Sequence, residues 1–476
     1  MRTITGRCFS METSARFFVH RQSQKAPYFK SFIWSFGVTL LTERKDIPIR
    51  EDFARMKVLI VNTSEKTGGA AIAAARLRDA LINNGVRAKM LVRTKESNNP
   101  TVVGLRPAWK TKWHFLAERF LIWAHNGFSR EHLFDIDTAT HGTDITKLPE
   151  FKEADVIHLH WINQGMLSLK NLRKILKSGK PMVWTMHDMW PFTGVCHHAR
   201  TCQGFITGCH DCDLLKHPGK HDLSTCVMQR KEQLFRGCNI YFIGCSQWLT
   251  NEAKQSRLFH NLSVTDIPNP LNTKVFSPSD KSAARKETGL PENKTLILFS
   301  AYKTTTPAKG IQYFIETCHL FNKQYPEMHD KIGIVAVGKE ADALSDLFPY
   351  PVYSQGYISD VQIMVNVYNA CDVFFMPSLQ ENLPNTIAEA MACGVPCIAS
   401  KVGGIPQMIN HLENGYLAQP RHSSSMVQGL EWFLFQCDKT AVSKAARAFA
   451  VAQYSEQNVA ARYIEIYNRV CEKGHE

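Results

Sequence analysis

The apolar residues of this chain gather in short continuous runs, and most of these runs are followed by a segment with helical periodicity. An apolar run of about four to eight residues, bounded by turn residues, is typical of a strand buried on both faces of a parallel sheet. Strands that alternate with helices predict an α/β protein with two Rossmann-like domains that face one another across a cleft. The predicted strands are residues 56–62, 86–92, 155–161, 181–188, 241–246, 295–299, 332–337, 372–377 and 395–400.

A proline-rich stretch at residues 267–278, between these two domains, predicts a linker, because its prolines disfavour regular structure. We place the last strand of the first domain at 241–246, before this linker. The predicted parts are an extension over 1–55, an N-terminal domain over 56–267, a linker over 268–278, a C-terminal domain over 279–441 and a helical tail over 442–476. Candidate packing residues of the tail are Tyr454, Val459, Tyr463, Ile464 and Tyr467.

The hydrophobic pattern of the chain changes at Met56, where the first predicted strand begins. Residues 1–55 lack a sustained periodic pattern. Their apolar run at 31–41 is shorter than the about 20 residues that a membrane span needs, and no small-residue cleavage pattern follows it. We therefore expect residues 1–55 to be a disordered extension or an over-long start of the chain.

The segment 372–400 reads as strand, acidic loop, helix and strand. Pro384 stands where a helix would start, and Gly394 stands where its C-terminal cap belongs. Glu381 then lies in the loop at the carboxyl end of the strand, and Glu389 lies about one turn into the helix. Both carboxylates are expected to face the crevice where open α/β sheets bind ligands. The alternative is that both face solvent.

Charge and cysteine content add to this picture without choosing a ligand. The 476 residues carry a net charge of +13, which favours anionic partners such as nucleotides, phospholipid surfaces or nucleic acid. Fourteen cysteines without a secretory signal indicate a reducing, cytoplasmic environment.

Four of these cysteines lie within 17 residues, at Cys196, Cys202, Cys209 and Cys212. In a reducing compartment this spacing favours a zinc site over a disulfide framework, although free thiols and a redox role stay open. Because four thiolates would fill the coordination sphere, such a zinc ion would be structural.

The segment 106–130 interleaves aromatic and basic residues at helical spacing. Such a pattern suits a membrane interface with anionic headgroups, and it equally suits a helix that packs its aromatic residues on its own domain. The aromatic residues are Trp109, Trp113, Phe115, Phe120 and Trp123.

Two further positions are candidates for a ligand site. His187 directly follows a buried strand, where ligand-facing loops begin, and a structural role is equally consistent with that position. Gly68 and Gly69 lie between the first strand and its helix, where paired glycines allow a backbone to approach a phosphate or simply form a tight turn.

The run 377–396, Pro-Ser-Leu-Gln-Glu-Asn-Leu-Pro-Asn-Thr-Ile-Ala-Glu-Ala-Met-Ala-Cys-Gly-Val-Pro, resembles the signature of GT-B glycosyltransferases of family 4. The resemblance extends from Met56 to the end of the chain. The run 184–194, with the cysteines behind it, resembles the subgroup that builds colanic-acid-like and capsular polysaccharides. Other matching pieces, in the order of that family, are Gly68-Gly69, 267–276, Lys309-Gly310, Gly356-Tyr357 and Gly403-Gly404.

This resemblance implies transfer of a sugar from a nucleotide-sugar donor to a hydroxyl, with retention of configuration and without a catalytic metal. Glu389 would hold the ribose hydroxyls and Glu381 the donor sugar. The remaining implied contacts are Lys303 and Lys309 with the diphosphate, His187 with the sugar, Gly68 and Gly69 with the phosphate and acceptor, and Tyr357 and Ile358 with the base.

Two positions depart from the family pattern. Lys303 stands where arginine is usual, which keeps the charge but loses the bidentate fork. Pro384 stands where glycine is usual and cannot donate an N–H, so Asn385 and Thr386 would supply the backbone donors.

The expected acceptor is a lipid-linked or other oligosaccharide. With such an acceptor, segment 106–130 would dock on the inner face of the cytoplasmic membrane; nucleic acid is not an expected partner. The alternative functions are a nucleotide-sugar epimerase or phosphorylase of the same fold, and a basic binding protein without catalysis.

Overall fold

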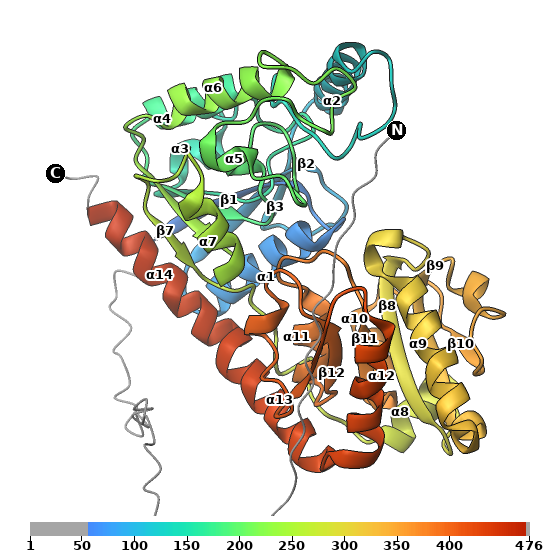
Figure 1. Ribbon diagram of the computed structural model, residues 1–476. Coiled ribbons are helices and arrows are strands. Elements are labelled where there is room, and N and C mark those ends of the chain that lie inside the picture. The colour runs from blue at the N-terminus through green and yellow to red at the C-terminus, as the bar shows by residue number, and fades with distance from the viewer. Residues whose placement is uncertain (1–55, 473–476) are drawn as a thin grey trace, which may run out of the picture. The chain divides into compact units, whose positions relative to one another are not determined.

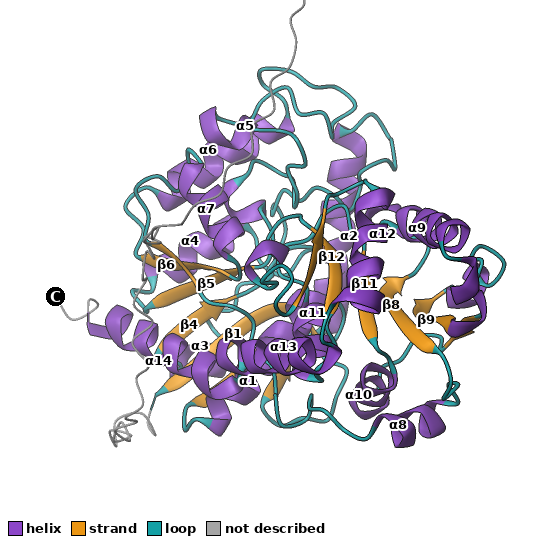
Figure 2. Ribbon diagram, turned by 60° about the horizontal axis from the view of Figure 1, so that its bottom comes forward, coloured by secondary structure: helices purple, strands orange, loops and turns teal. Residues whose placement is uncertain are grey.

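The computed structural model describes residues 56–472, which form two α/β domains, each built on a parallel sheet (Figures 1 and 2). The predicted fold class is confirmed. The prediction for residues 1–55 lies outside the described residues. Within 56–472, no helix is long and apolar enough to cross a membrane.

The first sheet has seven strands in the order β3-β2-β1-β4-β5-β6-β7. Every residue of β4 and β5 is buried, as their continuous apolar runs predict. The strands are β1 (Lys57–Ser64), β2 (Arg87–Thr94), β3 (Val102–Gly104), β4 (Val156–Leu159), β5 (Met182–Met186), β6 (Ile240–Gly244) and β7 (Val264–Asp266). The helices are α1 (Gly69–Asn83), α2 (Ala108–His125), α3 (Pro149–Glu153), α4 (Leu169–Lys177), α5 (Gly204–Thr207), α6 (Leu223–Phe235) and α7 (Gln247–Gln255).

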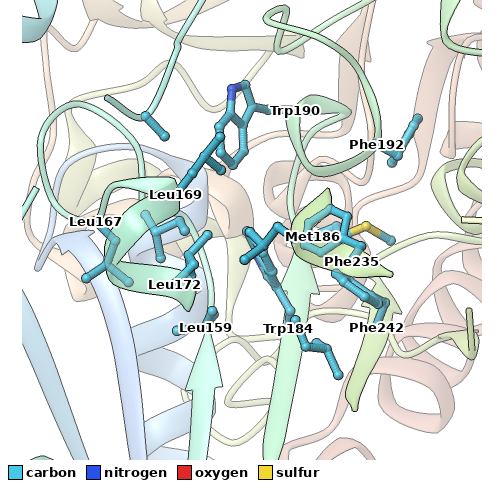
Figure 3. Packing of buried hydrophobic residues seen from close by; sticks show 14 of the residues in the cluster. Leu159, Leu167, Leu169, Leu172, Trp184, Met186, Trp190, Phe192, Phe235 and Phe242 are labelled. Atoms are coloured by element: carbon cyan, nitrogen blue, oxygen red, sulfur yellow. The ribbon is translucent and has the colours of Figure 1, made fainter. Parts of the chain in front are cut away.

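Aromatic side chains fill the core between this sheet and its helices (Figure 3). The ring of Trp184 on β5 stacks on Phe242 of β6, with ring centroids 5.7 Å apart. Trp190, in the loop after β5, is fully buried, and its indole N–H donates to the carbonyl of Asp137 at 2.8 Å. This packing fixes the path of the loop that leaves the carboxyl end of β5.

The second sheet has six strands in the order β10-β9-β8-β11-β12-β13. The strands are β8 (Thr295–Lys303), β9 (Ile332–Lys339), β10 (Val352–Ser354), β11 (Val373–Met376), β12 (Cys397–Ser400) and β13 (Gly415–Ala418). The helices are α8 (Lys281–Thr288), α9 (Ile311–Gln324), α10 (Val361–Ala370), α11 (Asn385–Ala392) and α12 (Ser423–Glu431).

The prediction that 241–246 is the last strand of the first domain was wrong, because β7 follows it and pairs with β6. All three residues of β7 are only half-buried. A strand of this kind has no continuous apolar run, so the hydrophobic pattern does not reveal it.

Two C-terminal helices, α13 (Lys439–Tyr454) and α14 (Glu456–Glu472), connect the domains (Figure 1). α13 packs on α11 of the second domain, whereas α14 returns to α1 of the first. Tyr463 and Tyr467 of α14 are buried. The Tyr463 hydroxyl lies 3.0 Å from Thr185 Oγ1, and the Tyr467 hydroxyl lies 2.8 Å from His158 Nδ1. The expected packing role of these two tyrosines is confirmed.

Candidate active site

A cavity of about 960 Å³ lies where loops from the carboxyl ends of strands in both sheets meet. The first sheet contributes residues that follow β1, β4 and β5, and the second contributes residues that follow β8, β10 and β11. Open α/β sheets bind ligands at this edge. Of the predicted site residues, Gly68, Gly69, His187, Lys309, Tyr357, Glu381, Asn385, Thr386 and Glu389 line the cavity.

Glu389 lies on α11 and is only 8% exposed, which excludes the solvent-facing alternative. Its Oε1 accepts a hydrogen bond from Arg76 Nη2 at 2.7 Å, and its Oε2 accepts one from the Tyr368 hydroxyl at 2.9 Å. Burial and the neighbouring carboxylate raise the pKa of Tyr368 well above its usual value, so this hydroxyl stays a donor. Arg76 comes from α1, so the pair joins the two domains.

Glu381 and Lys309 form a second ion pair, with Lys309 Nζ 2.6 Å from Glu381 Oε1. Lys309 ends a short turn before α9, and Gly310 follows it with φ 71°. A Cβ at Gly310 would lie 2.0 Å from the carbonyl oxygen of Pro377, at the end of β11. Glycine therefore lets this turn approach the strand closely enough for the two charges to meet.

His187 presents a neutral imidazole at the first-domain side of the cavity. Its Nε2 lies 2.9 Å from His160 Nδ1, and burial lowers the pKa of His187 to about 4 although Asp188 acts in the opposite direction. The carbonyl of His187 accepts a hydrogen bond from Asn382 Nδ2 at 2.9 Å. Asn382, next to Glu381, thereby ties the second domain to this loop.

The start of α11 lies opposite the glycine pair of the first domain. Pro384 is the N-cap residue and α11 begins at Asn385. The first backbone N–H groups of the helix therefore belong to Asn385 and Thr386. Asn385 Nδ2 lies 3.4 Å from the carbonyl oxygen of Gly69. On the second-domain side, the ring of Tyr357 packs edge-to-face on Tyr302 at 5.5 Å.

The comparisons with known proteins agree with this geometry. Residues 280–449 match the family model described as Glycosyl transferases group 1. Residues 280–449 thus form a group 1 glycosyltransferase domain, and the chain is a glycosyltransferase.

Its relatives and structural neighbours are distant. The putative colanic acid biosynthesis glycosyl transferase WcaC of Escherichia coli is 24% identical over 319 residues, which cover 64% of this chain and 72% of WcaC. Sucrose-phosphate synthase from Thermosynechococcus elongatus superposes with a TM-score of 0.62 at 17% identity, covering 87% of this chain and 99% of that chain. Anabaena HepE in complex with UDP-glucose superposes with a TM-score of 0.55 at 17% identity, covering 87% and 100%. These neighbours show the GT-B fold.

In this glycosyltransferase, Lys303 lies outside the cavity. Its ammonium pairs with Glu340 at 2.8 Å, its side chain is half exposed, and it does not line the cavity. β8 extends to Lys303, further than the predicted strand 295–299, and holds this residue in register with Lys339 of β9. Of the two lysines predicted to contact the diphosphate, Lys309 lines the cavity and Lys303 does not.

Sequence reasoning missed a group of polar residues in the loop after β5. Asp188 Oδ2 accepts hydrogen bonds from His197 Nδ1 at 2.7 Å and from Trp161 Nε1 at 2.8 Å. The His197 contact helps to lower the pKa of Asp188 to about 2, and Asp188 in turn raises that of His197. His198 also lines the cavity, and among residues 56–472 its buried Nδ1 finds no hydrogen-bond partner. The only sequence signal is their position after a buried strand.

The four clustered cysteines belong to the same loop, but the structure does not assemble them into a metal site. Among residues 56–472, no group of three or more His, Cys, Asp or Glu side chains is placed to hold a metal ion. Burial, together with the neighbouring thiols of this cluster, raises the thiol pKa to about 12 for Cys196, 11 for Cys209 and 12 for Cys212. Cys202 is exposed. Zinc binding by these four cysteines stays a prediction.

Proposed function

We propose that this glycosyltransferase moves a sugar from a nucleotide-sugar donor to a hydroxyl of a lipid-linked saccharide, with retention of anomeric configuration, in polysaccharide biosynthesis. The observation that carries the proposal is the meeting of Glu389, Glu381 and Lys309 in one cavity at the carboxyl edge of the second sheet. Two carboxylates and an ammonium match the hydroxyls and the diphosphate of such a donor.

Each part of the donor has a matching group. Glu389 accepts hydrogen bonds from the ribose hydroxyls through its free lone pairs, since a carboxylate offers about four acceptor sites. Lys309 and the first N–H groups of α11, at Asn385 and Thr386, face the diphosphate. The aromatic pair of Tyr302 and Tyr357 offers a surface for the base. The UDP-glucose bound in the Anabaena HepE structure supports a donor of this class.

In the proposed reaction the bond between the sugar C1 and the diphosphate oxygen breaks, and the acceptor oxygen bonds to C1 on the same face. The acceptor proton passes to the departing phosphate oxygen. Lys309 stabilises the negative charge that develops on the leaving group. Glu381, which is paired with Lys309, and the neutral ring of His187 orient the sugar.

The membrane part of the proposal depends on α2. Trp109, Trp113 and Phe120 are 67%, 63% and 59% exposed, so these three residues do not pack on their own domain. An exposed aromatic face flanked by basic residues fits the interface of an anionic membrane. A Campylobacter jejuni relative, which is 28% identical over 210 residues, transfers N-acetylgalactosamine to a diphospho-undecaprenol-linked sugar, and this supports a lipid-linked acceptor. The inner face of the cytoplasmic membrane follows as the proposed location.

The decisive variant is Glu389→Gln, which keeps the packing around Arg76 and Tyr368 and removes the charge. A thermal-shift screen of nucleotide sugars identifies the donor, because a ligand that binds only the native state raises the melting temperature. We expect Glu389→Gln to weaken donor binding roughly 100-fold, since charge-assisted hydrogen bonds to the ribose are lost. Glu465→Gln, an exposed carboxylate on α14, is the matched control. Wild-type transfer by Glu389→Gln would refute the assignment.

A further inference from the structure

A second cavity, of about 460 Å³, lies beside α2 in the first domain and shares none of its described lining residues with the donor cavity. Its charged lining residues are all cationic: Arg93, Lys95, Arg106 and Lys112. Among residues 56–472, none of these four forms an ion pair with a carboxylate. Four like charges around one hollow repel one another unless an anion joins them.

Two of the four cations are held in place by the fold. The Arg93 guanidinium donates to the carbonyl of Gln164 and lies 5.1 Å from the ring centre of Phe115. Burial and the nearby Arg119 lower the pKa of Arg93. The Lys95 ammonium donates to the carbonyls of Asn99 and Val102 at 2.9 and 2.8 Å. These contacts orient the charges without neutralising them, and Lys95, Arg106 and Lys112 are all exposed.

The cavity and the exposed aromatic residues occupy neighbouring stripes of the same helix. The residues of α2 that line the cavity are Ala108, Thr111, Lys112 and Phe115. The exposed apolar residues of α2 are Trp109, Trp113, Leu116 and Phe120. Both sets recur at helical spacing and are offset by about one residue, which is about 100° around the helix axis. An anion in the cavity would therefore lie beside the face that is proposed to enter the membrane.

We propose that this second cavity binds the phosphate headgroup of an anionic phospholipid. Arginine and lysine hold phosphate through charge-assisted hydrogen bonds, and the adjacent aromatic stripe would contact the acyl boundary of the same lipid layer. The inference rests on the membrane part of the proposed function, and it adds a specific lipid site to general attraction by charge. Headgroup binding would fix how α2 lies on the surface.

Two neighbouring lysines of α2 provide a matched comparison, because Lys112 lines the cavity and Lys110 does not. Vesicles of phosphatidylglycerol mixed with phosphatidylcholine are co-sedimented with the wild type, Lys110→Ala, Lys112→Ala and Arg106→Ala. Removal of any cation near an anionic surface weakens binding by roughly fivefold. Lys112→Ala and Arg106→Ala should weaken it by roughly 50-fold, because a direct phosphate contact is also lost.

A soluble probe separates a lipid site from a site for free phosphate. Dihexanoyl phosphatidylglycerol, below its micelle concentration, should raise the melting temperature of the wild type and of Lys110→Ala, and not that of Arg106→Ala. An equal rise with inorganic phosphate at the same concentration would overturn the lipid assignment. Equal vesicle binding by Lys110→Ala and Lys112→Ala would also overturn it. Absence of vesicle binding by the wild type would instead refute the membrane part of the proposed function. The test of donor binding with Glu389→Gln is independent of the lipid site and of membrane binding.

Discussion

His198 lines the cavity of the candidate active site, and one of its ring nitrogens has no hydrogen-bond partner among residues 56–472. This nitrogen, Nδ1, is buried, and the charges of Glu381 and Lys309 both act on the ring. Burial is the main cause of its lowered pKa, so the ring is a neutral donor and acceptor. We predict that His198→Ala lowers kcat/KM for sugar transfer roughly tenfold, the effect of one lost hydrogen bond. Binding of the nucleoside diphosphate, which lacks the sugar, should be unchanged.

The matched control is His210→Ala, because His210 belongs to the same cysteine-containing loop and its side chain is 57% exposed. Isothermal titration with the nucleoside diphosphate and steady-state kinetics with the donor measure the two quantities separately. An equal loss in both variants would mean that the loop, and not the His198 ring, affects transfer.

How far a residue's role could be predicted depended on how local its contacts are. The positions of Glu381 and Glu389 follow from one strand–loop–helix segment, and the structure places both in the cavity. Lys303 was assigned because the resemblance places it where arginine is usual, but β8 extends to this residue and its ammonium pairs with Glu340. Arg76 and His198 could not be found, because the second-domain charges that act on them lie more than 100 residues away along the chain.

At the scale of elements, the same limit explains which strands the hydrophobic pattern revealed. The strands that it missed, β3, β7, β10 and β13, are the outer strands of the two sheets. Each of these strands has three or four residues, and in each strand at least two residues are half-buried. An edge strand has one unpaired side and little cover, so it needs no continuous apolar run.

The contact of α14 with β4 and β5 makes stability depend on pH. His158 on β4 is fully buried between the Tyr467 and Thr185 hydroxyls, and burial lowers its pKa to about 3. In the unfolded chain a histidine has a pKa near 6.5. Below that pH the unfolded state binds a proton that the folded state does not bind, so the free energy of unfolding falls by about 1.4 kcal/mol per pH unit for this residue. The loss begins near pH 6.5 and ends near pH 3.

We predict that His158→Gln reduces this slope by about 1.4 kcal/mol per pH unit between about pH 4.5 and 6, because it removes the titrating ring. Urea unfolding at a series of pH values measures the slope. His260→Gln, at an exposed position, should leave the slope as in the wild type. Parallel curves for the wild type and His158→Gln would contradict a neutral buried His158.

At the scale of the whole molecule, charge and exposed aromatic residues together determine how the enzyme would meet its acceptor. A net charge of +13 attracts the chain to an anionic surface, but it does not orient the chain on that surface. In the proposed docking, the exposed face of α2 would orient the chain on the membrane. Transfer to a lipid-linked acceptor should therefore need this face, whereas transfer to a water-soluble acceptor should not.

We predict that the double variant Trp109→Ser/Trp113→Ser lowers transfer to a lipid-linked acceptor in phosphatidylglycerol vesicles by at least roughly tenfold, because two large apolar side chains no longer enter the interface. Transfer to a soluble analogue of the same saccharide should match the wild type, since neither tryptophan lines the donor cavity. Added salt should weaken the wild-type vesicle reaction, because it screens the attraction between the basic chain and the lipid. The role of α2 in docking would be refuted if the double variant kept full activity on vesicles at low salt, because the donor site would then reach its acceptor without this helix.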